Sequence, residues 1–507
     1  MVLESMLIIC SPLTLEGWIA RLREARIPVL RRSVEALLEL MRREDEVVAR
    51  DISNVILRDP MLTLSVLRTL QTLRPNRQIA DITTIEHGVM MMGVSPFFRQ
   101  FQNLSIVEDL FVENPVVLRG FMEVTTRAQH AALHARNWAA LRSDIESDEI
   151  AIAALLHDMA ELLIWFFAPQ LAIEIADRMK SVSPLRNAAV QQAVLGVRLS
   201  ELQLALCREW LLPNLLRSLM DEQQVHRQRV RNALLAVAFA RHSAHGWWDE
   251  ALPDDLAEIE NLLGLPGQEV KRNIYWVELA AITNQQYHAE SAVATWLPPA
   301  PLFFHHYSNR LSGAQYGFDS ELLEQTLHYL SCPVAAGHAA TYNHAHITAR
   351  NIGAIDTVAS AMNGIHAALG FDRVLFFDVD ESGSLLVPRY IVGGRSAGNS
   401  RGLHFSALDS PQLSGLLRQM RDATELAQLR EILAQLLSVE ACGRNPAEQC
   451  MALPLLDDLG QCGSLIYADC LSPHACGEEE IFTQFRNVVM AAEKRMGADQ
   501  AGRAKFK

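Results

Sequence analysis

The sequence predicts a multidomain protein, in which an all-α helical bundle is followed by an α+β domain built on an antiparallel sheet. Over residues 1–290, apolar side chains recur at intervals of three and four residues and β-branched alternation is nearly absent, which is typical of successive helices. Beyond residue 296, short apolar runs alternate with glycine-containing turns, which indicates strands. The length of 507 residues allows about two to four domains, each with its own core.

The clearest helical patterns lie in the first half of the chain. Residues 30–41 carry an amphipathic stripe, and residues 49–60 repeat it. Pro60 ends the second pattern, because proline disfavours helical geometry in the residue before it, and a further helix is expected over 61–72. Residues 150–167 are apolar nearly all round, so we expect a central helix of the bundle there, with His157 in its middle.

The second half begins with a proline-dense segment from Trp296 to Pro301, which predicts an exposed, protease-sensitive linker. Two helices, four strands and a closing helix are expected after it. The helices are predicted at 320–330 and 352–369, the strands at 372–380, 385–392, 452–456 and 463–469, and the closing helix at 478–496.

These features divide the chain into six predicted parts. They are a lead-in (1–12), a helical domain (13–245), a helical extension (246–295), a proline-rich linker (296–319), an α+β domain (320–500) and a tail (501–507).

Composition narrows the class of protein. Half of the residues are hydrophobic and 21% are charged, as in globular proteins, and the net charge of −14 argues against broad binding to nucleic acid. The opening residues lack the features of a signal peptide, and the longest aromatic-aliphatic run, 162–169, is far shorter than the about 20 residues of a membrane span. We therefore expect a cytoplasmic protein without a membrane partner. The eight cysteines form no CxxC pair, which favours reduced, buried thiols.

Several separated segments of the helical half resemble the HDOD family, a divergent relative of the HD-type metal phosphohydrolases. The similarity covers about residues 13–245 and rests on the order and spacing of the pieces. They are Ile27-Pro28-Val29-Leu30, residues 52–67 with Asp59-Pro60, residues 82–93, residues 154–162 with Leu-Leu-His-Asp, residues 195–197, and Trp210-Leu-Leu-Pro213.

The second half is similar to a GAF domain, an α+β fold that senses small molecules. The similarity lies in residues 370–378, residues 451–469 and the closing helix. The resemblance implies a pocket under the sheet, or a role in dimerisation. The signature of the cyclic-nucleotide-binding subclass and a clear chromophore cysteine are both missing, so the ligand stays open.

The sharpest local motif is His157-Asp158. In active HD enzymes, the resemblance implies, this pair joins an earlier histidine and a later aspartate in binding a divalent metal that activates water. This sequence departs from that pattern at the other positions. Residues 123–125 contain no histidine, Arg198-Leu199 stands where a later histidine is expected, and no aspartate occurs between Asp221 and Asp249. The motif is therefore predicted to be degenerate, and no cofactor, metal or catalytic residue is assigned.

Two interpretations of the motif stay open. In the first, His157 and Asp158 form a buried structural pair, hydrogen-bonded across the bundle. In the second, His130 and His134, which share one helix face, join His157 and Asp158 in a non-standard metal cluster. Two further histidine groups are weaker metal candidates: His305-His306, and His338 with His344 and His346.

We expect a bacterial signal-transduction protein. The HDOD-like part would be a non-catalytic regulatory platform that binds other signalling proteins, and the GAF-like part would sense a small molecule or form a homodimer. The alternative is an HD-type metal-dependent phosphohydrolase that acts on nucleotides or cyclic dinucleotides, and a third possibility is a purely structural dimer. The partner, the ligand and the pathway cannot be read from the sequence.

Overall fold

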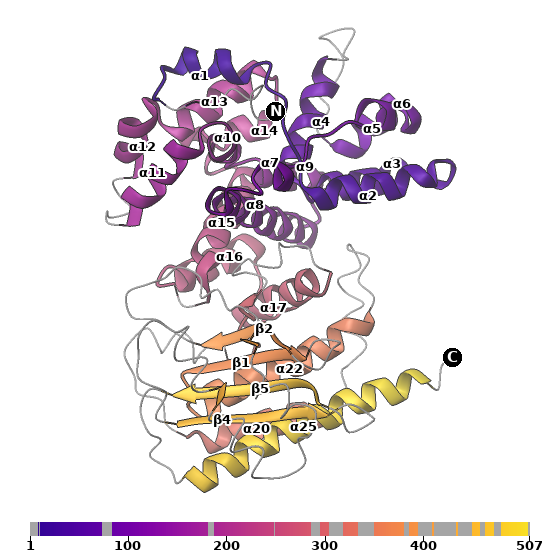
Figure 1. Cartoon of the computed structure of the whole chain (residues 1–507), viewed down its shortest axis with the longest axis vertical. Helices are drawn as coiled ribbons and strands as arrows, with labels where there is room; N and C mark the ends of the chain where they lie inside the picture. The colour runs from indigo at the N-terminus through magenta and orange to yellow at the C-terminus, as the bar shows by residue number, and fades with distance from the viewer. Residues whose placement is uncertain are drawn as a thin grey trace. The chain divides into compact units, whose positions relative to one another are not determined.

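A computed structural model describes most of the chain (Figure 1). The described residues are 9, 11–72, 84–180, 187–247, 249–284, 295–303, 318–332, 349–379, 385–393, 408–409, 432–433, 449–456, 462–470 and 478–504. They divide into two compact units. The N-terminal unit comprises residues 1–241 and 261–264, and the C-terminal unit comprises residues 242–260 and 265–507.

The N-terminal unit is helical, as predicted, and contains no strand among its described residues; an isolated bridge joins Val29 to Ile106. Its helices are α1 (Leu15–Leu22), α2 (Arg31–Arg42), α3 (Ala49–Ile56), α4 (Pro60–Thr72), α5 (Ile85–Met92), α6 (Val94–Gln100), α7 (Val107–Leu110), α8 (Pro115–Leu141), α9 (Ser147–Leu155), α10 (Met159–Phe167), α11 (Pro169–Lys180), α12 (Asn187–Leu195), α13 (Leu199–Glu209), α14 (Asn214–Ser218) and α15 (Gln228–His242).

The predicted break at Asp59-Pro60 is confirmed, and the aspartate has a structural role. Asp59 is fully buried, and its Oδ1 accepts hydrogen bonds from the backbone N–H of Met61 (2.9 Å) and Leu62 (3.1 Å), in the first turn of α4. Its Oδ2 accepts from Leu30 N–H and Ser33 Oγ, both at 2.8 Å. One carboxylate therefore caps α4 and ties it to the start of α2.

The 27-residue helix α8 is the longest in the N-terminal unit and packs against α9, α10 and α4. Asn114 caps it by accepting a hydrogen bond from Val117 N–H, with Pro115 in the first turn. At Gly120, a Cβ atom would lie 2.3 Å from the ring of Trp165 on α10, so only glycine permits this close approach of the two helices.

The C-terminal unit contains helices and one antiparallel sheet. The helices are α16 (Leu252–Leu263, whose last residues group with the N-terminal unit), α17 (Gly267–Thr283), α20 (Ser320–Ser331), α22 (Ala349–Ala368) and α25 (Glu478–Ala504). The strands are β1 (Arg373–Val379), β2 (Leu385–Gly393), β3 (Leu408–Asp409), β4 (Gln449–Leu456) and β5 (Cys462–Cys470), in the spatial order β3-β2-β1-β5-β4.

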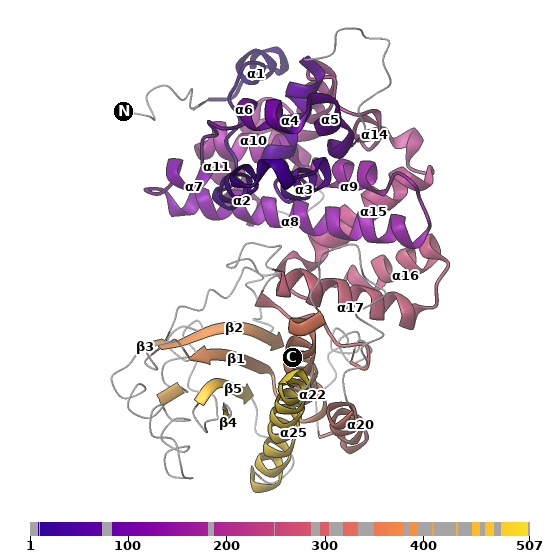
Figure 2. The ribbon, with the colours of Figure 1, turned by 90° about the vertical axis from the view of Figure 1, so that its right-hand side faces the viewer.

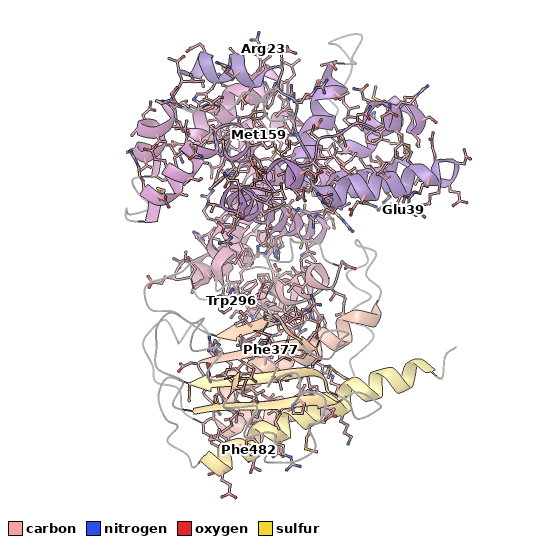
Figure 3. All side chains as sticks on the ribbon, in the orientation of Figure 1. Arg23, Glu39, Met159, Trp296, Phe377 and Phe482 are labelled. Atoms are coloured by element: carbon pink, nitrogen blue, oxygen red, sulfur yellow. The ribbon has the colours of Figure 1, made fainter. Side chains whose placement is uncertain are left out.

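Strand β1 is central and pairs with β2 and β5, with Leu375 opposite both Ile391 and Tyr467. Helix α22 packs against β1, β2 and β5, and α25 packs against β4, so both helices lie on one side of the sheet (Figure 2). Phe377, labelled in Figure 3, is fully buried in this unit, as Met159 is in the N-terminal unit. The predicted helices and the four predicted strands are thus present.

The expectation of an exposed linker is wrong for the described residues 295–303. Trp296, Leu297 and Phe303 are at most 4% exposed. Leu297 N–H donates to Ile391 O (3.1 Å) on β2, and the Trp247 indole N–H donates to Trp296 O (3.1 Å). Burial of these apolar side chains outweighs the tendency of proline-rich sequence to stay solvated. The rest of the predicted linker, 304–317, lies outside the described residues.

Of the predicted helical extension, 246–295, the described residues 246–247, 249–260, 265–284 and 295 group with the sheet, whereas residues 261–264 group with the N-terminal unit. By length and composition, one described stretch, 147–167, could cross a membrane, with a mean hydropathy of 1.8. It consists of α9, α10 and the turn between them, and 83% of its apolar window is buried, as in the core helices of a globular domain.

Candidate functional site

His157 and Asp158 do not lie in the middle of a helix, as the sequence predicts. They lie in the turn between α9, which ends at Leu155, and α10, which begins at Met159. A buried glutamine on α13 closes this turn: Gln203 Nε2 donates to Leu156 O (2.7 Å), and Gln203 Oε1 accepts from Ala160 N–H (2.9 Å). The glutamine satisfies backbone groups that the break leaves without helical partners.

Asp158 is the centre of an ion cluster on the surface of the turn. Arg127 of α8 donates from Nε (3.2 Å) and Nη2 (3.0 Å) to Asp158 Oδ2, and its Nη2 also donates to Glu161 Oε2 (2.6 Å) on α10. Arg241 of α15 lies 3.6 Å from Asp158 Oδ1. The side chains of Arg127 and Asp158 are 19% and 13% exposed, so water reaches the cluster only in part.

His157 joins the same cluster. Its Nδ1 lies 2.7 Å from Asp158 Oδ1, and its side chain is 18% exposed. The pair is thus half-buried and in contact with solvent, and Asp158 is shared between His157 and Arg127.

The neighbouring charges lower the pKa of Asp158 and raise the pKa of Arg127. Burial raises the pKa of Asp158, but Arg127, His157 and Arg241 outweigh it and hold that pKa well below its usual range. Burial lowers the pKa of Arg127, and Glu161 and Asp158 more than offset this effect, so that the pKa of the guanidinium is raised. Asp158 and Arg127 therefore both carry their charge at neutral pH.

The Asp158 oxygens of the motif are already engaged by other side chains. Asp158 Oδ2 accepts two bonds from Arg127, and its Oδ1 is bonded to His157 Nδ1. A metal at Asp158 would have to displace these partners, and His157 Nε2 is the ring nitrogen that lies outside this bond. The guanidinium of Arg127 supplies the positive charge that the two carboxylates need, and it lies between them as a cation would.

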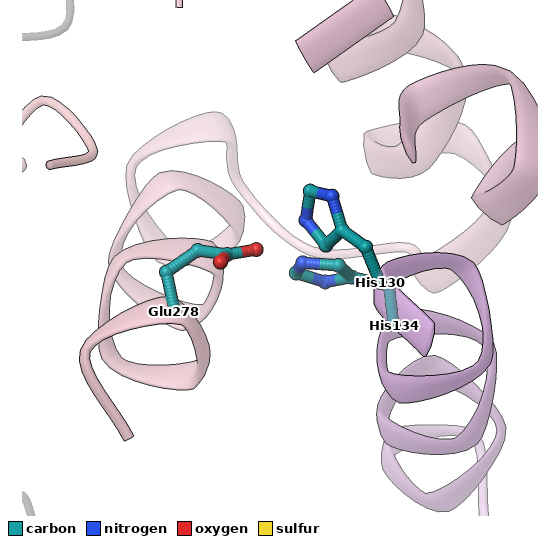
Figure 4. Close-up of side chains that lie close together, drawn as sticks. All are labelled: His130, His134 and Glu278. Carbon is teal, nitrogen blue, oxygen red and sulfur yellow. The ribbon is translucent and has the colours of Figure 1, made fainter. Parts of the chain in front are cut away.

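His130 and His134 are fully buried on α8, and their rings lie against each other with centroids 4.9 Å apart and planes tilted by 60° (Figure 4). Phe239 of α15 packs edge-on against both rings, at 5.7 and 4.9 Å. Among the described residues, the ring nitrogens of His130 and His134 do not gather with the nitrogens of His157 and the carboxylate oxygens of Asp158 closely enough to share an ion. The pair lies in an aromatic region of the core, and Glu278, also drawn in Figure 4, belongs to α17 of the C-terminal unit.

The two weaker histidine candidates, His305-His306 and the group of His338, His344 and His346, lie outside the described residues. Of the cysteines, Cys207 and Cys470 are buried, as expected, and form no disulfide, and burial raises the pKa of the Cys207 thiol to about 12. Cys332 is exposed, contrary to expectation, because it directly follows the end of α20.

Sequence reasoning missed Arg127 and Gln203. A signal for Arg127 is present in the sequence: it comes two residues after the segment 123–125, where the resemblance implies a metal-binding histidine that is absent, so a basic side chain stands close to the missing ligand. Gln203 had no local signal, because its partners lie 43 and 47 residues away in the chain.

Comparison with known proteins identifies the fold of this region. Residues 27–226 match the HDOD domain model. No curated protein sequence matches the chain.

Three solved structures are similar at low identity. The MmoQ response regulator of Methylococcus capsulatus str. Bath is 18% identical, with a TM-score of 0.40, over 50% of this chain and 99% of that one. A putative phosphohydrolase of Shewanella amazonensis SB2B is 18% identical over 51% of this chain and 92% of its own, with a TM-score of 0.27. An HDOD domain protein with unknown function from Geobacter sulfurreducens is 17% identical over 49% of this chain and 84% of its own, with a TM-score of 0.26. The family match carries the assignment: residues 27–226 of this chain are an HDOD domain.

Proposed function

We propose that the chain is a signal-transduction protein in which the HDOD domain is a non-catalytic regulatory platform. The observation that carries the proposal is the position of Arg127 between Asp158 and Glu161. A phosphohydrolase of the HD type needs a metal at its aspartate, and here a side chain of the protein supplies the cation instead. Without a metal to activate water, the domain keeps its fold and a surface for partners.

The C-terminal unit would be the sensory or dimerisation part. Its antiparallel sheet, in the order β3-β2-β1-β5-β4 with α22 and α25 on one side, is what a GAF-like domain would have. In this proposal, a small molecule or a second copy acts on the C-terminal unit, and other signalling proteins bind the HDOD domain.

Metal content and hydrolysis by the purified full-length protein test the proposal. We expect less than stoichiometric Mn, Fe or Zn, and no metal-dependent turnover of bis-p-nitrophenyl phosphate, nucleotides or cyclic di-GMP. Arg127→Lys keeps the charge and should behave like the wild type. Bound metal that is lost in His157→Ala, or turnover that is abolished in a folded Asp158→Ala variant, would instead establish an HD-type phosphohydrolase.

A further inference from the structure

The C-terminal unit contains a cavity whose lining residues belong neither to the ion cluster of Asp158 nor to the sheet. It has a volume of about 250 Å³ and lies between α17, residues 300–303, α20 and α22. Four aromatic side chains line it: Tyr275, Trp276, Phe303 and Tyr329. Tyr275, Trp276 and Phe303 are at most 6% exposed, whereas Tyr329 is 39% exposed, so the cavity reaches the surface beside Tyr329.

Two of these aromatic side chains are held in place by a buried carboxylate. Asp356 of α22 is fully buried and accepts hydrogen bonds from the hydroxyls of Tyr275 (2.8 Å) and Tyr329 (3.1 Å) and from Arg495 Nη2 (3.0 Å) of α25. The Arg495 guanidinium also lies 4.7 Å above the Tyr329 ring. Burial raises the pKa of Tyr329 to about 12, which keeps its hydroxyl protonated as a donor. A wall fixed in this way is organised before a ligand arrives.

The polar side chains that line the cavity include a guanidinium and hydroxyl groups. Arg272 lies on α17, about one helical turn before Trp276, is solvent-exposed, and makes no ion pair with a described residue. The Ser360 side chain is 2% exposed. Its Oγ has no hydrogen-bond partner of good geometry among the described residues, although the Tyr275 hydroxyl is a polar neighbour. Thr326, the other hydroxyl residue of the lining, is 1% exposed and donates to Leu322 O (2.7 Å). A ligand would therefore meet one positive charge, two buried hydroxyl side chains and several aromatic rings.

Size restricts the ligand further. An apolar cavity of about 150 Å³ holds a benzene molecule. A cavity of about 250 Å³ therefore accepts one ring with small substituents and is too small for a nucleotide with base, sugar and phosphate. Flat rings pack well against aromatic walls, and a guanidinium pairs best with a planar oxyanion such as a carboxylate.

We propose that this cavity binds a small aromatic carboxylate, with its ring against Trp276 and Phe303 and its carboxylate on Arg272. The proposal rests on the sensory role of the C-terminal unit and names the class of molecule it would sense. The site lies among helices α17, α20 and α22, so it is distinct from the pocket under the sheet that the GAF resemblance implies.

Isothermal titration of the full-length protein with 4-hydroxybenzoate tests the site. We expect saturable binding of one molecule per chain. The uncharged 4-hydroxybenzyl alcohol and the ring-free acetate should each bind about tenfold more weakly or less, because each lacks one of the two recognition elements. Absence of saturable binding by 4-hydroxybenzoate, or equal binding of the alcohol, would overturn the proposal.

Variants locate the binding. Arg272→Gln should weaken the affinity about tenfold or more, since it removes the charge partner from an exposed position where the fold is unaffected. Lys271→Gln, on the same helix and outside the cavity lining, is the matched control and should bind like the wild type. Ala300→Leu should fill the cavity and abolish binding. Wild-type affinity in Arg272→Gln would place the ligand elsewhere and overturn the site.

This outcome is separable from that of the proposed function. A protein without metal or hydrolytic activity that also fails to bind 4-hydroxybenzoate would leave the regulatory platform intact and remove the cavity proposal alone. Metal-dependent turnover would remove the platform, whatever the cavity binds.

Discussion

Each unit of this protein contains an aspartate–arginine pair. The two pairs differ in burial and in the number of carboxylates that share the guanidinium. In the C-terminal unit, Asp356 and Arg495 are 0% and 4% exposed, and one carboxylate meets one guanidinium. In the N-terminal unit, Asp158 and Arg127 are 13% and 19% exposed, and Arg127 serves a second carboxylate, Glu161. The first pair is enclosed by tyrosine hydroxyls, whereas the second is open to solvent.

The difference shows two uses of the same chemistry. Asp356 joins α22 to α17, α20 and α25, so its pair organises the packing around the aromatic cavity. Asp158 lies in a turn whose backbone is already closed by Gln203, so its pair adds less to the fold.

The largest expected effect is at the enclosed pair. Asp356→Ala should destabilise the C-terminal unit by about 3–5 kcal/mol, because it leaves Arg495 buried without a counter-charge and strands two tyrosine hydroxyls. Urea unfolding, together with hydrogen exchange in α20, α22 and α25, measures the loss. The control is Asp378→Ala, which breaks the more exposed pair with Arg389 (38% and 54% exposed) and should cost about 1 kcal/mol or less. Equal losses in the two variants would mean that burial does not distinguish the pairs.

The open pair should be weaker. Arg127→Ala should destabilise the N-terminal unit by about 1–3 kcal/mol, since Asp158 and Glu161 then repel each other but keep partial access to water. Hydrogen exchange of α8 and α10 during urea unfolding reports on this unit. Arg178→Ala, which breaks the exposed pair with Glu174, is the matched control, with about 0.5 kcal/mol expected. A loss as large as that of Asp356→Ala would erase the contrast between the two units.

A smaller effect is expected at His157. A position in the middle of an apolar helix, which the sequence suggests, would make His157→Ala cost a few kcal/mol. The side chain instead lies in a turn and is 18% exposed, with its bond to Asp158 on the surface. We therefore expect a loss of about 1 kcal/mol or less in a urea melt. A loss above about 3 kcal/mol would show that His157 supports the core.

The sequence predicts elements well where the signal is local. The strands β1 and β2 follow from two apolar runs around a turn, and the start of α4 follows from Asp59-Pro60. The break after Leu155 could not be predicted, because no glycine or proline marks it and its stabilising partner Gln203 is distant in the chain. Trp296 was assigned to a linker because local composition does not reveal that β2, far along the chain, covers it.

The same limit applies to the candidate site. The departure of the motif from the family pattern can be read from the sequence, since each missing ligand is an absence at one position. The sequence also shows a basic residue near one of these positions, but the contacts of Arg127 with Asp158 and Glu161 could not be predicted, because they depend on how α8 and α10 pack.

The smallest expected effect is a difference in pH dependence between the two aspartates. The pKa of Asp158 is held below its usual range, so the stability it contributes is complete above about pH 4 and is lost as the pH falls further. Burial raises the pKa of Asp356, and Arg495 and the two tyrosines offset this only in part. A raised pKa in the folded state means that stability increases as the pH falls from neutral toward the pKa of the unfolded chain.

The two aspartates should therefore respond with opposite signs, and their asparagine variants reveal it. As the pH falls from neutral, the stability of the wild type relative to Asp356→Asn should rise. Below about pH 4, the advantage of the wild type over Asp158→Asn should shrink. Urea melts across this range measure both differences. Parallel curves for the two variants would mean that Arg495 compensates the burial of Asp356 as fully as Arg127 compensates that of Asp158, and the enclosed pair would then differ from the open one in packing alone.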